Sequence, residues 1–494
     1  MAKEITTKKF AKNVIISIVA QIISLAVSFI LTLIVPKIID ESQYDTWQIY
    51  VLYVGYVGIL HFGLLDGLVL RYSKFDYEEL DKARLRSQFI ILLIFTSAVT
   101  AIGIVVSLLA LGAPLHIIFA LVAVGIVTKN LVTYSSYMFQ ITNRINKYVI
   151  LIIAQRLTYG LIVVVLLALK VNDFIWYCVA DLCGDTVGII IGACFNRGLF
   201  FGKTIGLKEA FKELKINVAA GIILMTANWS AMLLTGGAKM IIQWRWDDVF
   251  GKVMFAFNVS NVFLVFVTAI SVVLFPSLQR IAPEKLPSMY KNIRNVLSPV
   301  LFFLMIFYFV GCEILELWLP KYNDSLIYLG ILLPIIIFSS KVSLLTNNYL
   351  KVYRKEKLML LVNLISIAVG ALLFSLCAFV FGNMIALIAC VVFVIMLNSV
   401  LSEICVLKTI KVKIIKEFII EAVMTVAFIL CASLLKRWIG FGVYCVIFAV
   451  YCAINYKSII SLFKRVFKRK QPAPVQDAAT ETETIPTEEK ESTE

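Results

Sequence analysis

Six of the ionisable side chains that lie inside apolar stretches of this 494-residue chain have types and a spacing that indicate binding chemistry rather than catalysis. The cations are Lys129, Arg156, Lys239 and Lys341, and the acids are Asp181 and Asp185. A charge at the centre of a lipid bilayer costs about 2.5–3.5 kcal/mol on insertion scales. Each of these side chains is therefore expected to face a cavity or an oppositely charged partner.

The two acids lie in the segment "VADLCGDTVG", four residues apart. This spacing places both carboxylates on one face of a helix. Two buried carboxylates on one face either share a proton or pair with cations. One interpretation is a structural ion pair with Arg156 or Lys129. The other is an ion-coupling site in which Asp181 and Asp185 bind H⁺ or Na⁺ and couple it to a conformational change.

The four cations lie at different depths in their expected helices. Lys129 and Lys341 are each about ten residues from the expected cytoplasmic end, which is roughly 15 Å at 1.5 Å per residue and too deep to reach the interface easily. Arg156 lies one to two turns shallower. Lys239 lies nearer the outer end and follows Gly236-Gly237, where a long helix can bend. Cations gathered in a central cavity would attract an anionic cargo.

The elements that hold these residues are long apolar helices. The chain is 61% hydrophobic and 16% charged, whereas soluble domains are about 45–50% apolar and about 25% charged. Runs of about 20 apolar residues are long enough to cross a hydrocarbon core. The sequence predicts an all-α polytopic membrane protein with fourteen spans, at 13–36, 47–70, 88–111, 115–139, 148–170, 173–195, 216–244, 250–275, 295–317, 326–350, 358–381, 384–407, 417–436 and 440–457.

The distribution of Lys and Arg predicts the orientation of these helices. If the N-terminus is cytoplasmic, 34 of the 46 Lys and Arg residues fall in cytoplasmic segments and six at the outer side. Such an excess is the positive-inside bias. Six of the seven Trp residues fall at expected outer ends, and only Trp229 lies within a span. Both termini are therefore expected in the cytoplasm. The net charge of +15 comes mainly from the Lys and Arg residues of the cytoplasmic segments, which set the orientation of the helices.

Two equivalent halves are expected because each would hold six spans in the same orientation. Tyr137 follows Lys129 by eight residues, and the basic segment "NRINK" comes after it. In the second half Tyr349 follows Lys341 by eight residues, and the basic segment "YRKEK" comes after it. The expected organisation is an N-lobe (1–195), a cytoplasmic amphipathic linker (196–215), a C-lobe (216–407), two added helices with a basic end (408–470), and a disordered acidic tail (471–494). The segment 203–215 is expected to be an interfacial helix.

Several function classes find no support in the residues. A nucleic-acid-binding protein is not supported, because the basic residues do not belong to a soluble domain that could bind nucleic acid. The ten Cys residues lie almost entirely within spans and are interpreted as packing residues, not as disulfides or metal ligands. No Gly-rich phosphate loop and no HExxH motif occur, so neither catalytic residues nor a cofactor or metal site is expected. Asp66 is interpreted as a helix cap or as a partner of Arg71, and the two His residues as packing groups.

Four segments carry a resemblance to a known family: "KNVIISIVAQIISLAVSFILTLIVPKIID", "FGLLDGLVLRY", "FGKVMFAFNVSN" and "LELWLPKYNDSLIYLGILLP". Over about residues 1–460 the chain resembles the polysaccharide-repeat flippases (Wzx type) of the multidrug/oligosaccharidyl-lipid/polysaccharide exporter superfamily. The resemblance implies two six-helix lobes forming a V, a cationic lumen and alternating access.

The resemblance also implies a cargo and a location. The cargo would be an undecaprenyl-pyrophosphate-linked oligosaccharide, moved to the outer leaflet of the bacterial cytoplasmic membrane for capsule, O-antigen or exopolysaccharide assembly. The basic residues of the lumen would correspond to Lys129, Arg156, Lys239 and Lys341. Membrane lipids, a polysaccharide polymerase and glycosyltransferases would be its partners.

Three alternatives stay open on the sequence. The first is a drug exporter of the same superfamily, which would be expected to carry a central acidic site and usually twelve spans. The second is a flippase for a peptidoglycan precursor. The third belongs to the enzyme class and is a membrane-embedded glycan polymerase or acyltransferase, although no outer connection is long enough to fold into a catalytic loop.

Overall fold

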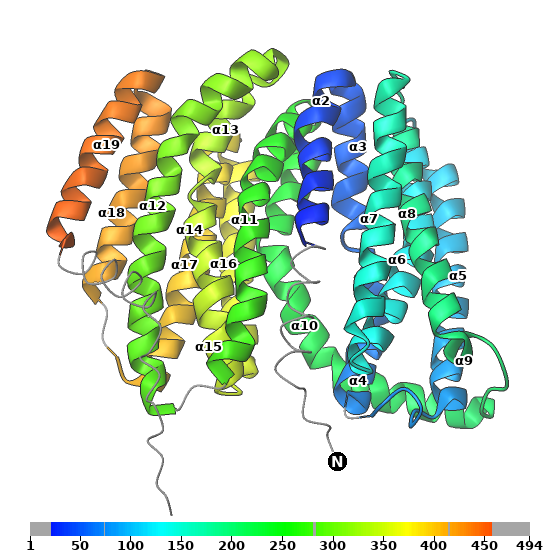
Figure 1. Ribbon diagram of the computed structural model, residues 1–494. Helices are drawn as coiled ribbons and strands as arrows, with labels where there is room; N and C mark the ends of the chain where they lie inside the picture. The colour runs from blue at the N-terminus through cyan, green and yellow to red at the C-terminus, as the bar shows by residue number, and fades with distance from the viewer. Residues whose placement is uncertain (1–20, 74, 280–282, 413–414, 457–494) are drawn as a thin grey trace, which may run out of the picture.

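The computed structural model describes residues 21–73, 75–279, 283–412 and 415–456, and these residues form helices and connecting turns without a strand (Figure 1). The first half of the chain contains the π-turn η1 (Ile30–Ile34), α2 (Val35–Ile38), α3 (Glu41–Val54), η2 (Val57–His61), α4 (Leu64–Tyr72), α5 (Lys82–Ala110), α6 (Leu115–Ile141), α7 (Ile145–Ala168), α8 (Phe174–Phe195) and α9 (Arg197–Phe200).

The second half begins with the long helix α10 (Leu207–Arg245). After it come η3 (Asp247–Val249), α11 (Phe250–Gln279), η4 (Pro283–Lys285), α12 (Leu286–Trp318), η5 (Pro320–Tyr322), α13 (Ser325–Leu332), α14 (Ile335–Lys341), η6 (Val342–Thr346), α15 (Asn347–Val352), α16 (Glu356–Ser375), η7 (Leu376–Val380), α17 (Met384–Ile410), α18 (Ile415–Leu434) and α19 (Arg437–Ile454).

The all-α polytopic fold predicted from the sequence is confirmed. Within the described residues, twelve helices are long and apolar enough to cross a membrane, and a bent pair of helices makes thirteen. The 30-residue helix α11 coincides with a further expected span, 250–275. The chain is therefore a multi-pass membrane protein. The start of the first span (13–20), the basic end and the acidic tail lie outside the described residues.

The second expected span, 47–70, is bent rather than straight. It consists of Glu41–His61 followed by Leu64–Tyr72, with an angle of 55° between the two parts. The backbone turns at Phe62 and Gly63, whose φ angles are +47° and +80°. Glycine adopts such an angle without a Cβ penalty, so Gly63 allows the bend, whereas Phe62 enters the left-handed region as a non-glycine residue. The span also begins six residues earlier than expected.

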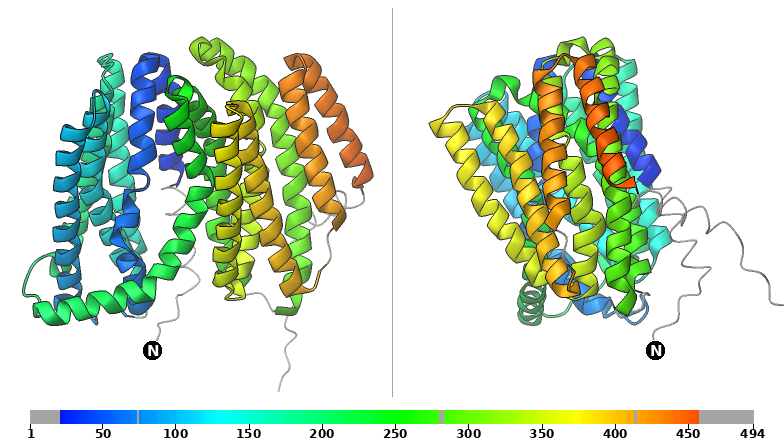
Figure 2. Two further views of the ribbon diagram at one scale, coloured as in Figure 1. Left: turned by 180° about the vertical axis from the view of Figure 1, so that it is seen from behind. Right: turned by 90° about the vertical axis from the view of Figure 1, so that its left-hand side faces the viewer.

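The expected linker helix and the expected span 216–244 form one helix, α10, of 39 residues. The stretch 207–220 contains no Gly or Pro, so the helix does not end at Lys215. The first part of α10 lies across the base of the N-terminal half, and the rest rises beside the C-terminal half (Figure 2). The helix crosses α4 very closely, because a Cβ added to Gly67 would lie 1.9 Å from the backbone oxygen of Asn217. Small residues at such a crossing allow close backbone packing.

The helices form two bundles that lie side by side in Figure 1, blue to cyan for the first half and green to orange for the second. The bundles meet at the end that the sequence predicts to be outside. There the rings of Tyr44 and Tyr322 are 5.5 Å apart, and Asn258 donates to the side-chain oxygen of Gln48 over 3.0 Å. The indole nitrogen of Trp318 also donates to the carbonyl of Leu33.

Candidate functional site

A cavity of about 570 Å³ opens beside the contacts that join the two bundles. Elements of both bundles line it: α3, α6, α7 and α8 from the first, and α10 and α11 from the second. We call it the central cavity. Its polar and aromatic lining includes Ser28, Thr32, Trp47, Gln48, Tyr50, Lys129, Thr133, Gln155, Arg156, Tyr159, Asp181, Trp229 and Asn258. Its volume lies within the range of about 300–1,000 Å³ that is usual for small-molecule sites.

Lys129 pairs with both acids of α8. Its Nζ lies 2.8 Å from Oδ2 of Asp181 and 2.9 Å from Oδ2 of Asp185. The i,i+4 spacing of the acids on α8 brings both carboxylates to the same side of the helix, facing α6. The ion pair that the sequence left open is therefore formed with Lys129. The Lys129 and Asp181 side chains keep 25% and 14% of their surface exposed, whereas Asp185 is fully buried.

Neutral side chains complete the hydrogen bonding of the two carboxylates. The Tyr50 hydroxyl donates to Asp181 over 3.0 Å. The Thr128 hydroxyl and the Gln155 amide donate to Asp185 over 3.1 Å and 2.6 Å. A buried carboxylate needs this degree of compensation because unpaired charge is costly away from water. Asp185 therefore stabilises the packing of α8 against α6 and α7, whereas Asp181 also lines the central cavity.

Arg156, unlike Lys129, has no acidic partner among the residues that the structure describes. It lines the central cavity from α7, is exposed, and none of the described carboxylates lies within 4.0 Å of its guanidinium. Trp229 of α10 lies on the lining of the same cavity and packs against Tyr56 at a ring distance of 6.0 Å. A planar guanidinium with unused donors suits a phosphate or a carboxylate, and an indole face suits a sugar ring.

The other two cations predicted for the site lie elsewhere. The Nζ of Lys239 lies 4.5 Å from the ring centroid of Phe257, and Lys239 does not line the central cavity. Lys341 is fully buried. The structure thus brings together Lys129, Arg156 and Asp181, but not Lys239 or Lys341.

Lys341 belongs to a second charge cluster, in the second bundle. Its Nζ lies 2.6 Å from Glu403 and 2.5 Å from Glu421. Arg294 pairs with the same two acids, at 2.6 Å and 2.9 Å, and the Tyr290 hydroxyl donates to Glu403. All four charged side chains are at most 3% exposed. Two cations and two anions balance, which leaves no free charge for a cargo in this cluster.

Glu403, Glu421 and Arg294 are not among the residues predicted from the sequence. Glu403, in "VLSEICVL", is the only acid of the expected span 384–407, and Glu421, in "IIEAVMTV", is the only acid inside the span 417–436 after its first residue, Glu417. Because an acid inside a span needs a partner, both glutamates could have been matched to Lys341. Arg294 was assigned to a cytoplasmic loop because it directly precedes an expected span, but α12 begins nine residues earlier and buries it.

The interpretation of Asp66 as a partner of Arg71 is wrong. Asp66 is buried with its Oδ2 3.7 Å from Nε2 of His61, and Arg71 pairs with Glu213 of α10 at 2.6 Å. The bend before α4 turns His61 toward Asp66, while the close α4–α10 crossing brings Glu213 within reach of Arg71.

Among the described residues no three His, Cys, Asp or Glu side chains form a group that could hold a metal ion.

Solved structures share this fold. An inward closed structure of the lipid II flippase MurJ matches with a TM-score of 0.65 and 12% identity, over 91% of this chain and all of that one. An inward-facing multidrug resistance MATE transporter of the MOP superfamily matches with a TM-score of 0.60 and 11% identity, over 79% and 94%. A MOP superfamily transporter from Pyrococcus furiosus has a TM-score of 0.53 at 11% identity, over 84% and 96%.

These likenesses place the chain in one fold class: it has the fold of the MOP superfamily transporters. No protein-family model and no curated protein matches its sequence. The likeness in structure covers 79–91% of this chain at a sequence identity of only 11–12%.

Proposed function

We propose that the protein is a transporter that moves a lipid-linked anionic oligosaccharide from the inner to the outer leaflet of a bacterial cytoplasmic membrane. Both of its termini would lie in the cytoplasm, and it would act beside the glycosyltransferases and polymerase of a surface glycan. The observation that carries the proposal is Arg156, an exposed cation without an acidic partner among the described residues, on the wall of the central cavity. The shared fold with MurJ and MATE transporters supports transport.

Arg156 would bind the pyrophosphate or an acidic sugar by charge-assisted hydrogen bonds. Trp229 would offer a flat apolar face to a neighbouring sugar ring, and Thr133 and Gln155 would hydrogen-bond hydroxyl groups. The polyprenyl tail would stay in the bilayer between the bundles. These contacts would offset the main energetic cost of translocation, because each unpaired polar group taken into hydrocarbon costs several kcal/mol.

Lys129 would link cargo binding to ion binding. It is held by Asp181 and Asp185, but it keeps part of its surface on the central cavity. A phosphate that draws Lys129 away would leave two carboxylates with one cation fewer. Uptake of H⁺ or Na⁺ by Asp181 would then restore the balance and favour one arrangement of the bundles. Lys239 and Lys341 have no part in this scheme.

The proposal is tested by replacing Arg156 in cells that make the surface glycan. Arg156→Gln should remove most surface glycan at unchanged protein abundance, and Arg156→Lys should restore part of it. Lys147→Gln, on the same helix but outside the central cavity, is the matched control. Normal glycan in the Arg156→Gln strain would overturn the assignment.

A second candidate is the flipping of lipid II, the cargo named for the MurJ structure. The observation that favours it is the TM-score of 0.65 over 91% of this chain. Depletion of the protein would then cause lysis rather than loss of a surface glycan. A drug exporter is less well supported, because an unpaired Arg156 would repel cationic drugs. A polymerase or acyltransferase would chemically change the lipid-linked substrate, which the proposed transporter leaves intact.

A further inference from the structure

A second large cavity, of about 590 Å³, lies between α5 and the first part of α10, away from the central cavity. We call it the α5–α10 cavity. Its lining is almost wholly apolar and includes Ile94 and Ala98 of α5 and Leu207, Phe211, Leu214 and Val218 of α10. At its rim Ile94, Leu207 and Phe211 are each more than half exposed. Apolar side chains exposed at a rim are stabilised by contact with hydrocarbon rather than with water.

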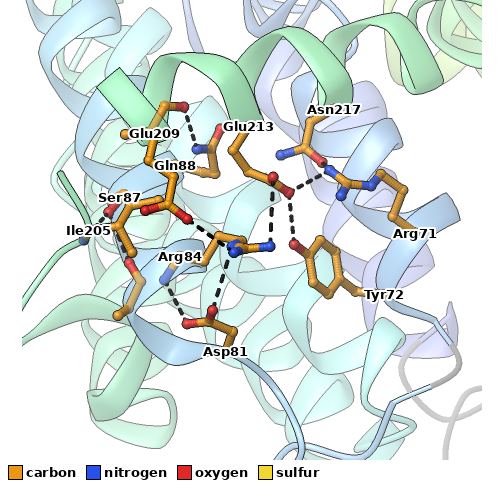
Figure 3. Close-up of polar contacts among 12 residues, drawn as sticks. Arg71, Tyr72, Asp81, Arg84, Ser87, Gln88, Ile205, Glu209, Glu213 and Asn217 are labelled. Atoms are coloured by element: carbon orange, nitrogen blue, oxygen red, sulfur yellow. Dashed lines mark hydrogen bonds and ion pairs between the residues drawn. The ribbon is translucent and has the colours of Figure 1, made fainter. Parts of the chain in front are cut away.

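Polar contacts hold the walls of this cavity in place (Figure 3). The Gln88 amide donates to the carbonyl of Ala210 over 3.0 Å, and the backbone N–H of Ile205 donates to the Ser87 hydroxyl over 3.0 Å. Arg84 of α5 pairs with Glu209 at 3.1 Å. These contacts fix α10 against α5, so the cavity is a built part of the fold.

Glu213 adds the contact with α4. It is nearly buried and lies within ion-pair distance of Arg71 and Arg84, and it also accepts from the Tyr72 hydroxyl over 3.0 Å. Figure 3 shows these side chains converging on one face of α10. The polar anchoring side of the helix therefore faces α4 and α5.

The first part of α10 carries three different faces. At 100° per residue, Leu207, Phe211, Leu214 and Val218 form one apolar stripe, which lines the cavity. Glu213 and Asn217 form the anchoring stripe on one side of it. On the other side, Lys208, Lys212 and Lys215 form a third stripe, and all three are exposed. None of the described carboxylates forms an ion pair with these three lysines, so the contacts that anchor the helix do not involve them.

We propose that the α5–α10 cavity binds one acyl chain of an anionic phospholipid, whose phosphate contacts Lys208 and Lys212. The helix lies at the end of the protein that the positive-inside bias assigns to the cytoplasm, where the leaflet carries anionic lipids. An apolar stripe beside a stripe of lysines is the arrangement that binds such a leaflet. The bound lipid would fill the space between α5 and α10 and brace the segment of α10 that joins the two bundles. This proposal does not depend on the identity of the transported cargo.

The test uses the full-length protein with phosphatidylglycerol and phosphatidylcholine of the same chain length. Native mass spectrometry measures how many molecules of each lipid stay bound. A phosphatidylglycerol with a diazirine at the end of one acyl chain reports the place. We expect a preference for phosphatidylglycerol, with labelled peptides from 90–98 and 207–218. Labelling confined to other helices would overturn the proposal.

Two variants separate the acyl chain from the phosphate. Ala98→Trp places an indole in the mouth of the cavity and should weaken retention about tenfold, because it displaces about two buried methylenes. Its control is Ala101→Trp, an exposed site on the same helix that does not line the cavity. Lys208→Gln with Lys212→Gln should reduce the preference for phosphatidylglycerol about 30-fold, at about fivefold per lysine. Lys351→Gln with Lys357→Gln, on the other bundle, should not.

Each other result counts against the site. Equal retention of both lipids by the wild type would show that the lysines do not select a phosphate. Unchanged retention in Ala98→Trp, in a variant with wild-type thermal stability, would place the acyl chain elsewhere. Displacement of the label by a polyprenyl phosphate, but not by phosphatidylglycerol, would assign the cavity to the tail of the transported lipid.

Discussion

Replacement of Lys341 by Met should destabilise the protein without acting on cargo binding. Lys341 is fully buried between Glu403 and Glu421, at 2.6 Å and 2.5 Å. Its removal leaves two carboxylates against the single guanidinium of Arg294. Breaking a buried ion pair from one side costs about 3–5 kcal/mol, because the remaining charge is uncompensated. At about 2–4 °C per kcal/mol, the unfolding midpoint of the second bundle should fall by roughly 6–20 °C.

The assay is thermal unfolding of the detergent-solubilised protein, followed by tryptophan fluorescence. A second variant, Lys341→Met with Glu421→Gln, restores the charge balance and should regain most of the lost stability, since the pair Arg294–Glu403 remains. Lys351→Met removes an exposed lysine of the neighbouring helix α15 and should change little. Suppose Lys341→Met is as stable as the wild type but no longer transports. Lys341 would then act on the cargo, and the structural interpretation of this cluster would be refuted.

Two further predictions concern helix packing and the contact between the bundles. Gly67→Leu should lower the unfolding midpoint, because a Cβ there would lie 1.9 Å from the backbone oxygen of Asn217, and overpacking costs about 1–3 kcal/mol. Gly237→Leu, with no atom within 4 Å, is the control, and equal effects would contradict the close crossing. Gln48→Leu with Asn258→Leu removes a hydrogen bond of about 1 kcal/mol that joins the bundles. Labelling of a cysteine variant at Ser28 from the outer side should become about fivefold faster, and an unchanged rate would exclude a gating contribution.

The apolar spans were predictable from the sequence because each helix must be apolar along about 20 residues to cross a membrane. The bend at Phe62-Gly63 was not, since a lone FG pair inside an apolar run does not reveal its φ angles. The join of linker and span into α10 was missed for a related reason. The boundary was drawn where the polarity of the sequence changes, at Lys215, but helix-forming residues continue across it. Polarity marks the edge of the membrane rather than the end of a helix.

The internal similarity between the two halves is more informative in the structure than in the sequence. Lys129 pairs with Asp181 and Asp185 of α8, and Lys341 pairs with Glu403 of α17. In the order of spans, both pairings join the fourth helix of a half to its sixth. The sequence indicated the two lysines and the acids Asp181 and Asp185, but not Glu403, which lies at a different position along its helix from the two aspartates. The exposed fractions of the two lysines, 25% and 0%, separate a lysine on the central cavity from one inside a packed cluster.

The central claim is that Arg156 holds an anionic group of the cargo in the central cavity, and translocation in proteoliposomes tests it most directly. A fluorescent lipid-linked acidic oligosaccharide is placed in one leaflet, and its appearance in the other is followed by quenching. Transport is expected from the wild type and from Lys147→Gln. Arg156→Gln should be about 10–100-fold slower, the loss expected for a charged hydrogen bond of about 1.5–3 kcal/mol. Transport by Arg156→Gln at the wild-type rate would contradict the central claim.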